Sequence, residues 1–459
     1  MGFMMLNIAS RALAAQQLAL DVTGNNMANA TTPGYRAETA NLTEAPPQPV
    51  VSLQGSELGT GVVVSSVSRA NNPFLSRSVR TQLTNQGYWS STNQALSQIQ
   101  SLFQEPSASG LQEGMNNFFA SWQTLANAPQ NQASQESVIQ QGNNLAAQFN
   151  TLATNITNEM ANLSQTAHNQ VSQVNTLTAE IAQLNTKIAT VTSGGGSAND
   201  LLNQRGTLLD SLASLTNITY TLTPNQEVNV YLGSNALVVN GTHYQIGLQQ
   251  ATTAASNYPA NAPLPYQLTW QAAPGTTPAP LSGINGGALF GTLSALGHNL
   301  PAYLGQLNNL AATLSSKVNS ALANAVPPVT GGFFNTVTSG DGASLIQVAP
   351  GLTPSALVST TNPGSGSAAL AVSQLGSTIS PLYTALVGQV GVDGQNAVNQ
   401  AQTAKSTLAS LKNARQSATG VDINQQSALL IQEQQSYTAA ATMVSVEQST
   451  LQSLMQAVG

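Results

Sequence analysis

The stretch LNIASRALAAQQLALDVTGNNMANATTPGY, residues 6–35, decides the fold of this 459-residue chain. A large apolar residue recurs there every seven positions, at Leu6, Leu13, Leu20 and Met27. The end of the chain repeats the spacing at Ile423, Leu430, Tyr437, Val444, Leu451 and Val458. Such spacing is typical of the seam of a coiled coil. The two stripes therefore predict that the terminal helices pair, so that the chain leaves and returns at one place.

The first helix is predicted to end in a sharp turn. Pro33 has no amide hydrogen, Gly34 accepts a positive φ, and the pair is typical of the middle of a type II turn. The alternative for Gly34 is an ordinary loop glycine. Tyr35 can anchor the turn by burying its ring and bonding through its hydroxyl. The side chains of Asn26 and Asn29 can form hydrogen bonds with backbone groups that lack a partner at the helix end. The alternative, nearly as well supported, is that both are ordinary polar residues in contact with water at the helix end.

The rest of the chain predicts a mainly α fold with a small inserted β domain. Helical spacing runs from about residue 133 to 192 and stops at a flexible run, 193–197. From residue 218 the apolar spacing changes to two, and Asn240-Gly241 between two strand-like runs predicts a hairpin. Helical spacing returns near residue 291. Residues 329–380 are predicted as loops and irregular β structure, and helices follow to the end with a break near residue 420.

We expect these elements to form nested, discontinuous domains. The terminal coiled coil is expected innermost, a long-helix bundle forms the next layer, and the β domain lies at the tip of the excursion. The predicted segments are 1–75 (N-terminal axial helix, turn motif and short β segment), 76–217 (long-helix bundle), 218–283 (inserted β domain), 284–380 (returning helix and Gly/Ser/Thr-rich loops) and 381–459 (C-terminal helices pairing with the N-terminus).

Composition narrows the function classes. Only 6% of residues are charged and the net charge is −6, without any run of Lys or Arg. Nucleic acid and anionic membrane surfaces are therefore not expected as partners.

The chain has no cysteine, which excludes disulfides and zinc–thiolate sites. We predict no transmembrane helix, because no stretch reaches about 18 apolar residues. The N-terminus lacks the basic and apolar regions of a cleavable secretory signal.

No catalytic, cofactor or metal site is predicted. His168, His243 and His298 fall in three different predicted elements and lack the spacing of metal ligands. Asn199 and Asp200 are interpreted as a cap for the helix 201–215, with Arg205 as a salt-bridging arginine. The glycines at 194–196 are interpreted as a linker, because no phosphate-loop motif surrounds them. The sequence therefore favours a protein that is not an enzyme.

The run NNMANATTPGY, residues 25–35, resembles the signature shared by the axial proteins of the bacterial flagellum, which are its rod, hook and hook-associated proteins. The matching residues are Asn26, Asn29, Thr32, Pro33, Gly34 and Tyr35. Residues 59–80, 197–215 and 427–459 together resemble the hook-associated protein 1 family. The likeness covers both ends of the chain and much of its middle.

The resemblance implies a structural subunit that self-assembles and acts as an adaptor at the hook–filament junction, where it is needed for filament attachment. It further implies export through the flagellar type III apparatus to the outside of the cell. The implied partners are the hook protein, a second hook-associated junction protein, and an export chaperone at the C-terminal helix.

Two alternatives stay open from the sequence. One is another flagellar axial subunit, of the rod or hook, against which the long helix near 133–192 speaks. The other is a secreted surface adhesin that binds through the β domain.

Overall fold

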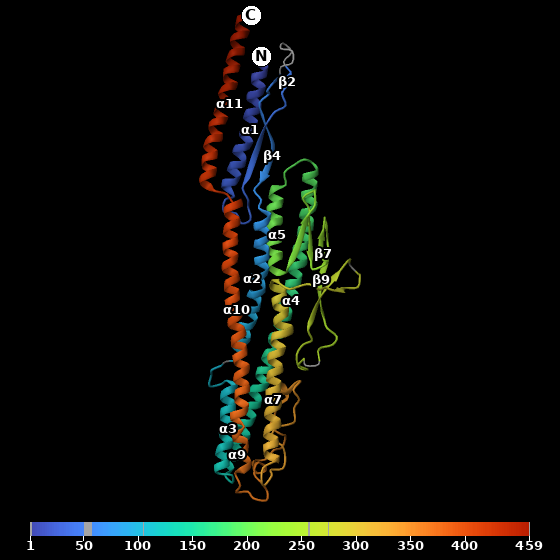
Figure 1. The fold of residues 1–459 in the computed structure, drawn as a ribbon, viewed down its shortest axis with the longest axis vertical. Helices are drawn as coiled ribbons and strands as arrows, with labels where there is room; N and C mark the ends of the chain where they lie inside the picture. Colours follow the sequence, from blue (N-terminus) through green and yellow to red (C-terminus); the bar gives the residue numbers. More distant parts are fainter. Residues whose placement is uncertain (1, 50–56, 104, 256–257, 274, 459) are drawn as a thin grey trace.

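A computed structural model describes the chain apart from residues 1, 50–56, 104, 256–257, 274 and 459. Its long helices lie roughly along one axis, with both termini at the same end (Figure 1). The helices are α1 (Gly2–Ala28), α2 (Pro73–Phe103), α3 (Leu111–Asn127), α4 (Gln132–Ser193), α5 (Asn199–Leu215), α6 (Gly287–Ser294), α7 (Leu300–Ala323), α8 (Gly342–Leu345), α9 (Ser367–Gln374), α10 (Gly376–Thr419) and α11 (Ile423–Val458). A π-helical turn, η1 (Ala295–Asn299), joins α6 to α7, and a 3₁₀ turn, η2 (Pro354–Leu357), precedes α9.

The strands form small antiparallel sheets. They are β1 (Glu38–Glu44), β2 (Gln48–Pro49), β3 (Glu57–Leu58), β4 (Val62–Arg69), β5 (Ile218–Leu222), β6 (Val228–Leu232), β7 (Asn235–Val239), β8 (Thr242–His243), β9 (Gln245–Gln250), β10 (Tyr266–Gln271) and β11 (Ala279–Pro280). β1 pairs with β4 and β2 with β3. The middle of the chain carries a four-stranded sheet, β5-β6-β7-β8, and a three-stranded sheet, β11-β10-β9. The mainly α fold with an inserted β region is confirmed.

α11 lies along α1, and the β1–β4 pair packs on α1 as well (Figure 1). We call α1, β1, β4 and α11 the terminal module. The prediction that both C-terminal helices pair with the N-terminus is wrong for the first of them. α10 packs mainly along α2 and buries Tyr383, Leu386 and Val390 against the bundle. The break at Gly420 separates the two, so only α11 is free to follow α1.

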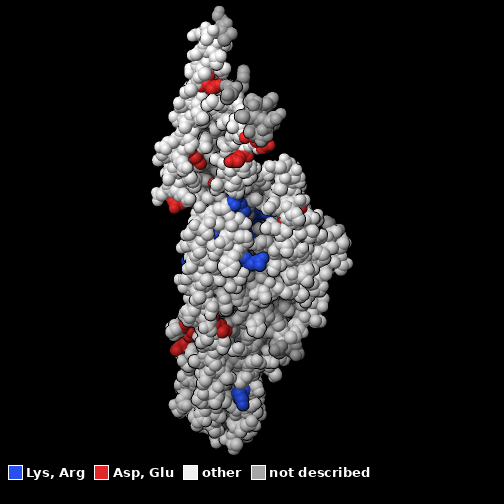
Figure 2. Space-filling view, turned by 45° about the horizontal axis from the view of Figure 1, so that its top comes forward, with Lys and Arg blue, Asp and Glu red and all other residues white. Residues whose placement is uncertain are grey.

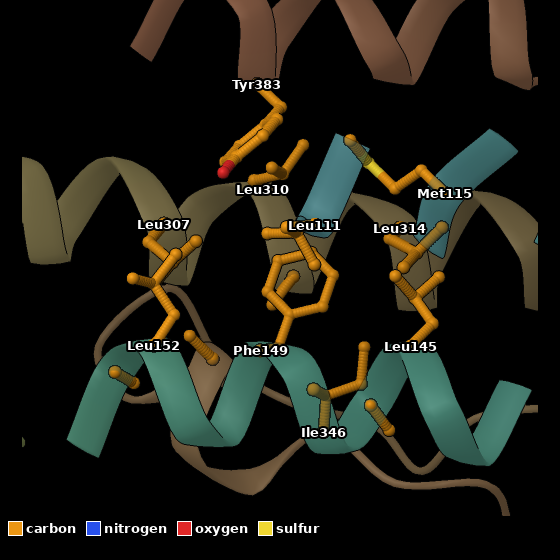
Figure 3. Close-up of a cluster of buried hydrophobic side chains, with 14 of the residues drawn as sticks. Leu111, Met115, Leu145, Phe149, Leu152, Leu307, Leu310, Leu314, Ile346 and Tyr383 are labelled. Carbon is orange, nitrogen blue, oxygen red and sulfur yellow. The ribbon is translucent and has the colours of Figure 1, made fainter. Parts of the chain in front are cut away.

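The helical bundle has a continuous dry core. Phe149 of α4 lies between Leu145 and Leu152 and faces α7, α3 and Tyr383 of α10 (Figure 3). Figure 3 also shows Ile346 in this cluster, although it belongs to the segment that the sequence predicts as loops. The prediction of loops and irregular β structure holds only in part, because α8, η2, α9 and the first residues of α10 lie in this segment. Phe333 of the same segment is fully buried. The buried backbone amide of Phe333 has a side-chain partner, because it donates a hydrogen bond to the Asn319 Oδ1 at 2.7 Å.

The β region packs on the side of α4, about midway along the molecule (Figure 1). Asn185 of α4 holds it by pairing with the backbone of Val228, donating to its carbonyl at 2.7 Å and accepting from its amide at 3.0 Å. The predicted hairpin is present, with Asn240 at a φ of 52°. The predicted place of the β region at the tip is wrong, because the end farthest from the termini is formed by the bundle. The exact domain boundaries stay a prediction.

Candidate functional site

The axial motif forms the turn that the sequence predicts. The Tyr35 amide donates to the Thr32 carbonyl at 3.2 Å across Pro33 and Gly34, and Gly34 has a φ of 85°. These features define a type II turn, whose third position strongly favours glycine. A side chain at Gly34 would also run into the Thr207 Oγ1 of α5. The glycine is therefore required by backbone conformation and by the close approach of α5.

Asn26 is the centre of the junction between α1, β1 and α11. Its side chain is 1% exposed. Its Nδ2 donates to the Glu38 carbonyl at 2.8 Å and to the Gln426 Oε1 at 3.0 Å. Its Oδ1 accepts from the Glu38 amide at 2.8 Å and from the Tyr35 hydroxyl at 3.0 Å. All four hydrogen-bonding positions of the amide are thus filled. The alternative of solvated helix-end polarity is excluded for Asn26.

Tyr35 and Asn29, which lie after and before the turn, form further hydrogen bonds beside Asn26. The buried Tyr35 hydroxyl also accepts from the Asn25 Nδ2 at 3.2 Å. Burial, followed by the nearby Glu38 and Asp200 carboxylates, raises the pKa of Tyr35 to about 12. The phenol is therefore neutral at physiological pH, and its hydrogen bond to Asn26 is retained. Asn29 is half-buried and donates to the Asn25 carbonyl at 3.1 Å.

Thr32 and Pro33 are exposed on the outer side of the turn. The Thr32 hydroxyl donates to the Asn29 Oδ1 at 3.1 Å. The turn faces a cavity of about 670 Å³ that α4 and α5 close from the other side. The motif therefore joins the terminal module to the bundle through α5, and its outer residues keep surface for other contacts.

The predicted terminal seam is partly buried within the single chain. Its four α1 positions, Leu6, Leu13, Leu20 and Met27, are half-buried. On α11, Leu430, Val444 and Leu451 are half-buried as well. Ile423 and Tyr437 are exposed, so the structure does not bring these two into the helix pair. The side chain of Val458 lies outside the described residues.

The sequence interpretation missed the other half of the seam. The buried or half-buried positions three residues after the predicted ones are Gln426, Glu433, Ala440 and Glu447. They share the seven-residue spacing, and with the predicted positions they form the alternating three- and four-residue steps of a coiled coil. Thr23 of α1 donates to the Glu433 Oε1 at 3.1 Å. A search for apolar residues overlooks this line because three of its four members are polar.

The histidines lie on separate elements, as expected, and all three are exposed. His168 contacts the Ser164 carbonyl at 2.8 Å on its own helix. Among the described residues, no group of three or more His, Asp or Glu is placed to hold a metal ion. In the same part of the chain, no helix is both long and apolar enough to span a bilayer.

Two interpretations around α5 are wrong. The helix begins at Asn199, and neither Asn199 nor Asp200 caps it, because the N-cap position is Ala198 and carries no side-chain bond. The Asn199 Nδ2 instead donates to the Val67 carbonyl at 3.1 Å. Arg205 is 5% exposed and donates to the Asn185 Oδ1 at 3.0 Å, a neutral partner in place of the expected carboxylate. Tertiary contacts with β4 and α4 decide both outcomes.

Two family models match parts of this chain. The family model described as "Flagellar hook-associated protein FlgK helical domain" matches residues 96–328, about half of the chain. The model described as "Flagella basal body rod protein" matches residues 6–36, which contain most of α1 and the whole axial motif.

Among curated proteins, flagellar hook-associated protein 1 of Bacillus subtilis is 28% identical, over 100% of this chain and 98% of that protein. The protein of the same name from Salmonella typhimurium is 26% identical, over 69% of this chain and 56% of its own length. Among solved structures, the flagellar hook junction protein FlgK from Burkholderia pseudomallei aligns with a TM-score of 0.49 and 23% identity, over 56% of this chain and 46% of that one. On the match of its helical domain, the chain belongs to the flagellar hook-associated protein FlgK family.

Proposed function

We propose that this protein is a structural subunit of the bacterial flagellum that acts as an adaptor at the hook–filament junction and is needed for filament attachment. The observation that carries the proposal is the junction at Asn26, which fixes α1, β1 and α11 in one module at the end where both termini lie. Family membership supports it, because the relatives are named as hook-associated proteins.

The mechanism is geometric. Copies pack through different patches of the same chain around the axis, and such heterologous contacts generate rings or helices. The half-buried seam residues, Leu6, Leu13, Leu20 and Met27 among them, have apolar surface left for neighbouring copies. One end of the assembly would match the hook and the other would accept the second junction protein. The low charge, 6% of residues, keeps repulsion between copies small.

The experiment is deletion of the gene, followed by electron microscopy of the cells and an assay of flagellin in the medium. We expect bare hooks, with flagellin lost to the medium. Cells without hooks would indicate instead that the protein is a subunit of the rod or hook. Normal filaments would contradict every axial role and leave the secreted adhesin.

We also propose that the protein acts outside the cell and that an export chaperone binds α11. The exposed apolar residues of α11, which include Ile431, Met443 and Leu454, support helix-in-groove recognition. Removal of residues 420–459 should abolish chaperone binding in a pull-down from the cytoplasm. Unchanged binding would contradict this proposal and leave the adaptor role intact.

A further inference from the structure

The basic residues of this chain are concentrated around one cavity. The chain has 11 Lys and Arg in total. Among the lining residues of a cavity of about 590 Å³ are Arg36, Arg69, Arg77, Arg80 and Arg205. No carboxylate belongs to the described lining. Figure 2 shows basic atoms gathered in the middle of the molecule, below the acidic atoms of the terminal part. We call this space the arginine cavity.

Most of these guanidinium groups have neutral hydrogen-bond partners. Arg36 donates to the Asn71 Oδ1 at 2.8 Å and to the Ser76 Oγ at 3.0 Å. Arg69 donates to the Asn203 Oδ1 at 2.9 Å. Neutral oxygens occupy some of the N–H groups and leave the positive charge uncompensated.

Asp210 is the nearby carboxylate that pairs directly with an arginine of the cavity. It bonds Arg80 at 2.9 Å and shares its other oxygen with Arg415 at 2.7 Å. Burial, followed by neighbouring arginines, lowers the pKa values of Arg36, Arg69 and Arg205 to about 10, although Asp210, Glu38 and Glu227 act in the opposite direction. An added anion would relieve this repulsion.

The mouth of the cavity is apolar. Phe74 is 76% exposed and Leu222 is 57% exposed, and both line the cavity. Aromatic side chains and arginines are both enriched in protein interfaces, and an exposed leucine adds apolar surface beside them. The cavity therefore suits a protein segment that presents a carboxylate next to apolar side chains.

The same chain carries such residues on β1 of the terminal module and on β3. Leu42 and Glu44 of β1 and Glu57 and Leu58 of β3 are all exposed. We call these four residues the acidic arm. Within one copy the arm cannot reach the cavity, since Glu44 pairs with Val62 and β4 runs from there to Arg69, about 23 Å at about 3.3 Å per residue.

We propose that the arginine cavity is a docking site for the acidic arm of a neighbouring copy of this chain. The contact is heterologous, because the two patches differ, and it would repeat from copy to copy along the assembly. Glu44 and Glu57 would form charge-assisted hydrogen bonds with the free N–H groups of the arginines. Leu42 and Leu58 would cover Phe74 and Leu222. This inference rests on the proposed assembly into the flagellum.

The absence of cysteine allows a direct test by cross-linking in flagella assembled in cells. The double variant Leu42→Cys/Leu222→Cys retains every charge of both patches. On mild oxidation we expect covalent dimers and longer ladders of this chain. Leu345→Cys/Leu222→Cys is the matched control, because Leu345 is also an exposed leucine, at 53%, and lies in the bundle away from the arm. Absence of cross-links in flagella that carry filaments, or equal cross-linking in the control, would overturn the inference.

A charge swap gives a second readout. Arg77 is exposed, so Arg77→Glu should leave the urea midpoint of the purified chain unchanged and reduce the fraction of hooks with filaments severalfold. Arg77→Glu/Glu44→Arg should restore at least half of that fraction, whereas Lys317→Glu, an exposed charge on α7, should have no effect. Loss without restoration by the swap would overturn the docking contact. Failure of the adaptor role itself would appear separately, as normal filaments on cells without the gene.

Discussion

The terminal module and the helical bundle are both made of long helices, yet they are held together differently. The bundle encloses Phe149, Trp122 and Phe333, which are fully buried within one chain. In the terminal module the buried positions are mostly small or polar, such as Ala19, Asn26 and Glu447, and the large apolar residues are mostly half-buried or exposed. The bundle is therefore stabilised by apolar packing within one chain, while the terminal module relies more on hydrogen bonds and keeps apolar surface exposed.

The largest expected effect tests the bundle. Phe149→Ala removes a fully buried ring and should lower the free energy of unfolding by about 3–5 kcal/mol. Urea denaturation of the full chain, followed by circular dichroism, measures this loss. The control is Phe74→Ala, whose ring is exposed. A loss below about 1 kcal/mol for Phe149→Ala would mean that the core tolerates a large cavity. It would contradict the claim that apolar packing stabilises the bundle more than the terminal module.

The next effect concerns the junction at Asn26. Asn26→Ala leaves the Glu38 backbone groups and Gln426 without their buried partner, which should cost about 1–3 kcal/mol in total. The loss should be local, so hydrogen exchange should accelerate in α1, β1 and the start of α11 and stay unchanged in α4. Asn29→Ala, at a half-buried position, is the control. Equal acceleration in α4 would show that the two regions unfold as one unit.

Gly34 tests the contact between the regions. Gly34→Ala places a side chain at a φ of 85° and should cost about 1–2 kcal/mol for the backbone alone. The new methyl also meets the Thr207 Oγ1, so Gly34→Ala/Thr207→Ala should recover part of the stability, measured by thermal unfolding. A double variant no more stable than Gly34→Ala would mean that the approach of α5 does not constrain the turn.

The smallest effect on the free chain is expected in the seam. Leu20→Ala removes a half-buried side chain and should cost about 1 kcal/mol or less in urea denaturation. In cells it should lower filament attachment more than the exposed Gln17→Ala does, because neighbouring copies would bury the rest of Leu20. Equal attachment in the two variants would remove Leu20 from the assembly seam.

The sequence by itself determined the long helices, the inserted strands and the turn at Pro33-Gly34. Apolar spacing of seven, three to four, or two follows from local geometry, and Gly34 follows from its backbone conformation. It also determined half of the terminal seam, because apolar residues mark their face of a helix by spacing alone.

Only the tertiary structure decided the polar part of that seam, the route of α10 along α2 and the neutral partners of Arg205. The reason is physical. A buried polar side chain is stabilised by the particular groups that meet it, and Asn26 meets Glu38 of β1 and Gln426 of α11 from far along the chain. The sequence shows that Asn26 can donate and accept hydrogen bonds, but only the fold determines which groups are its partners.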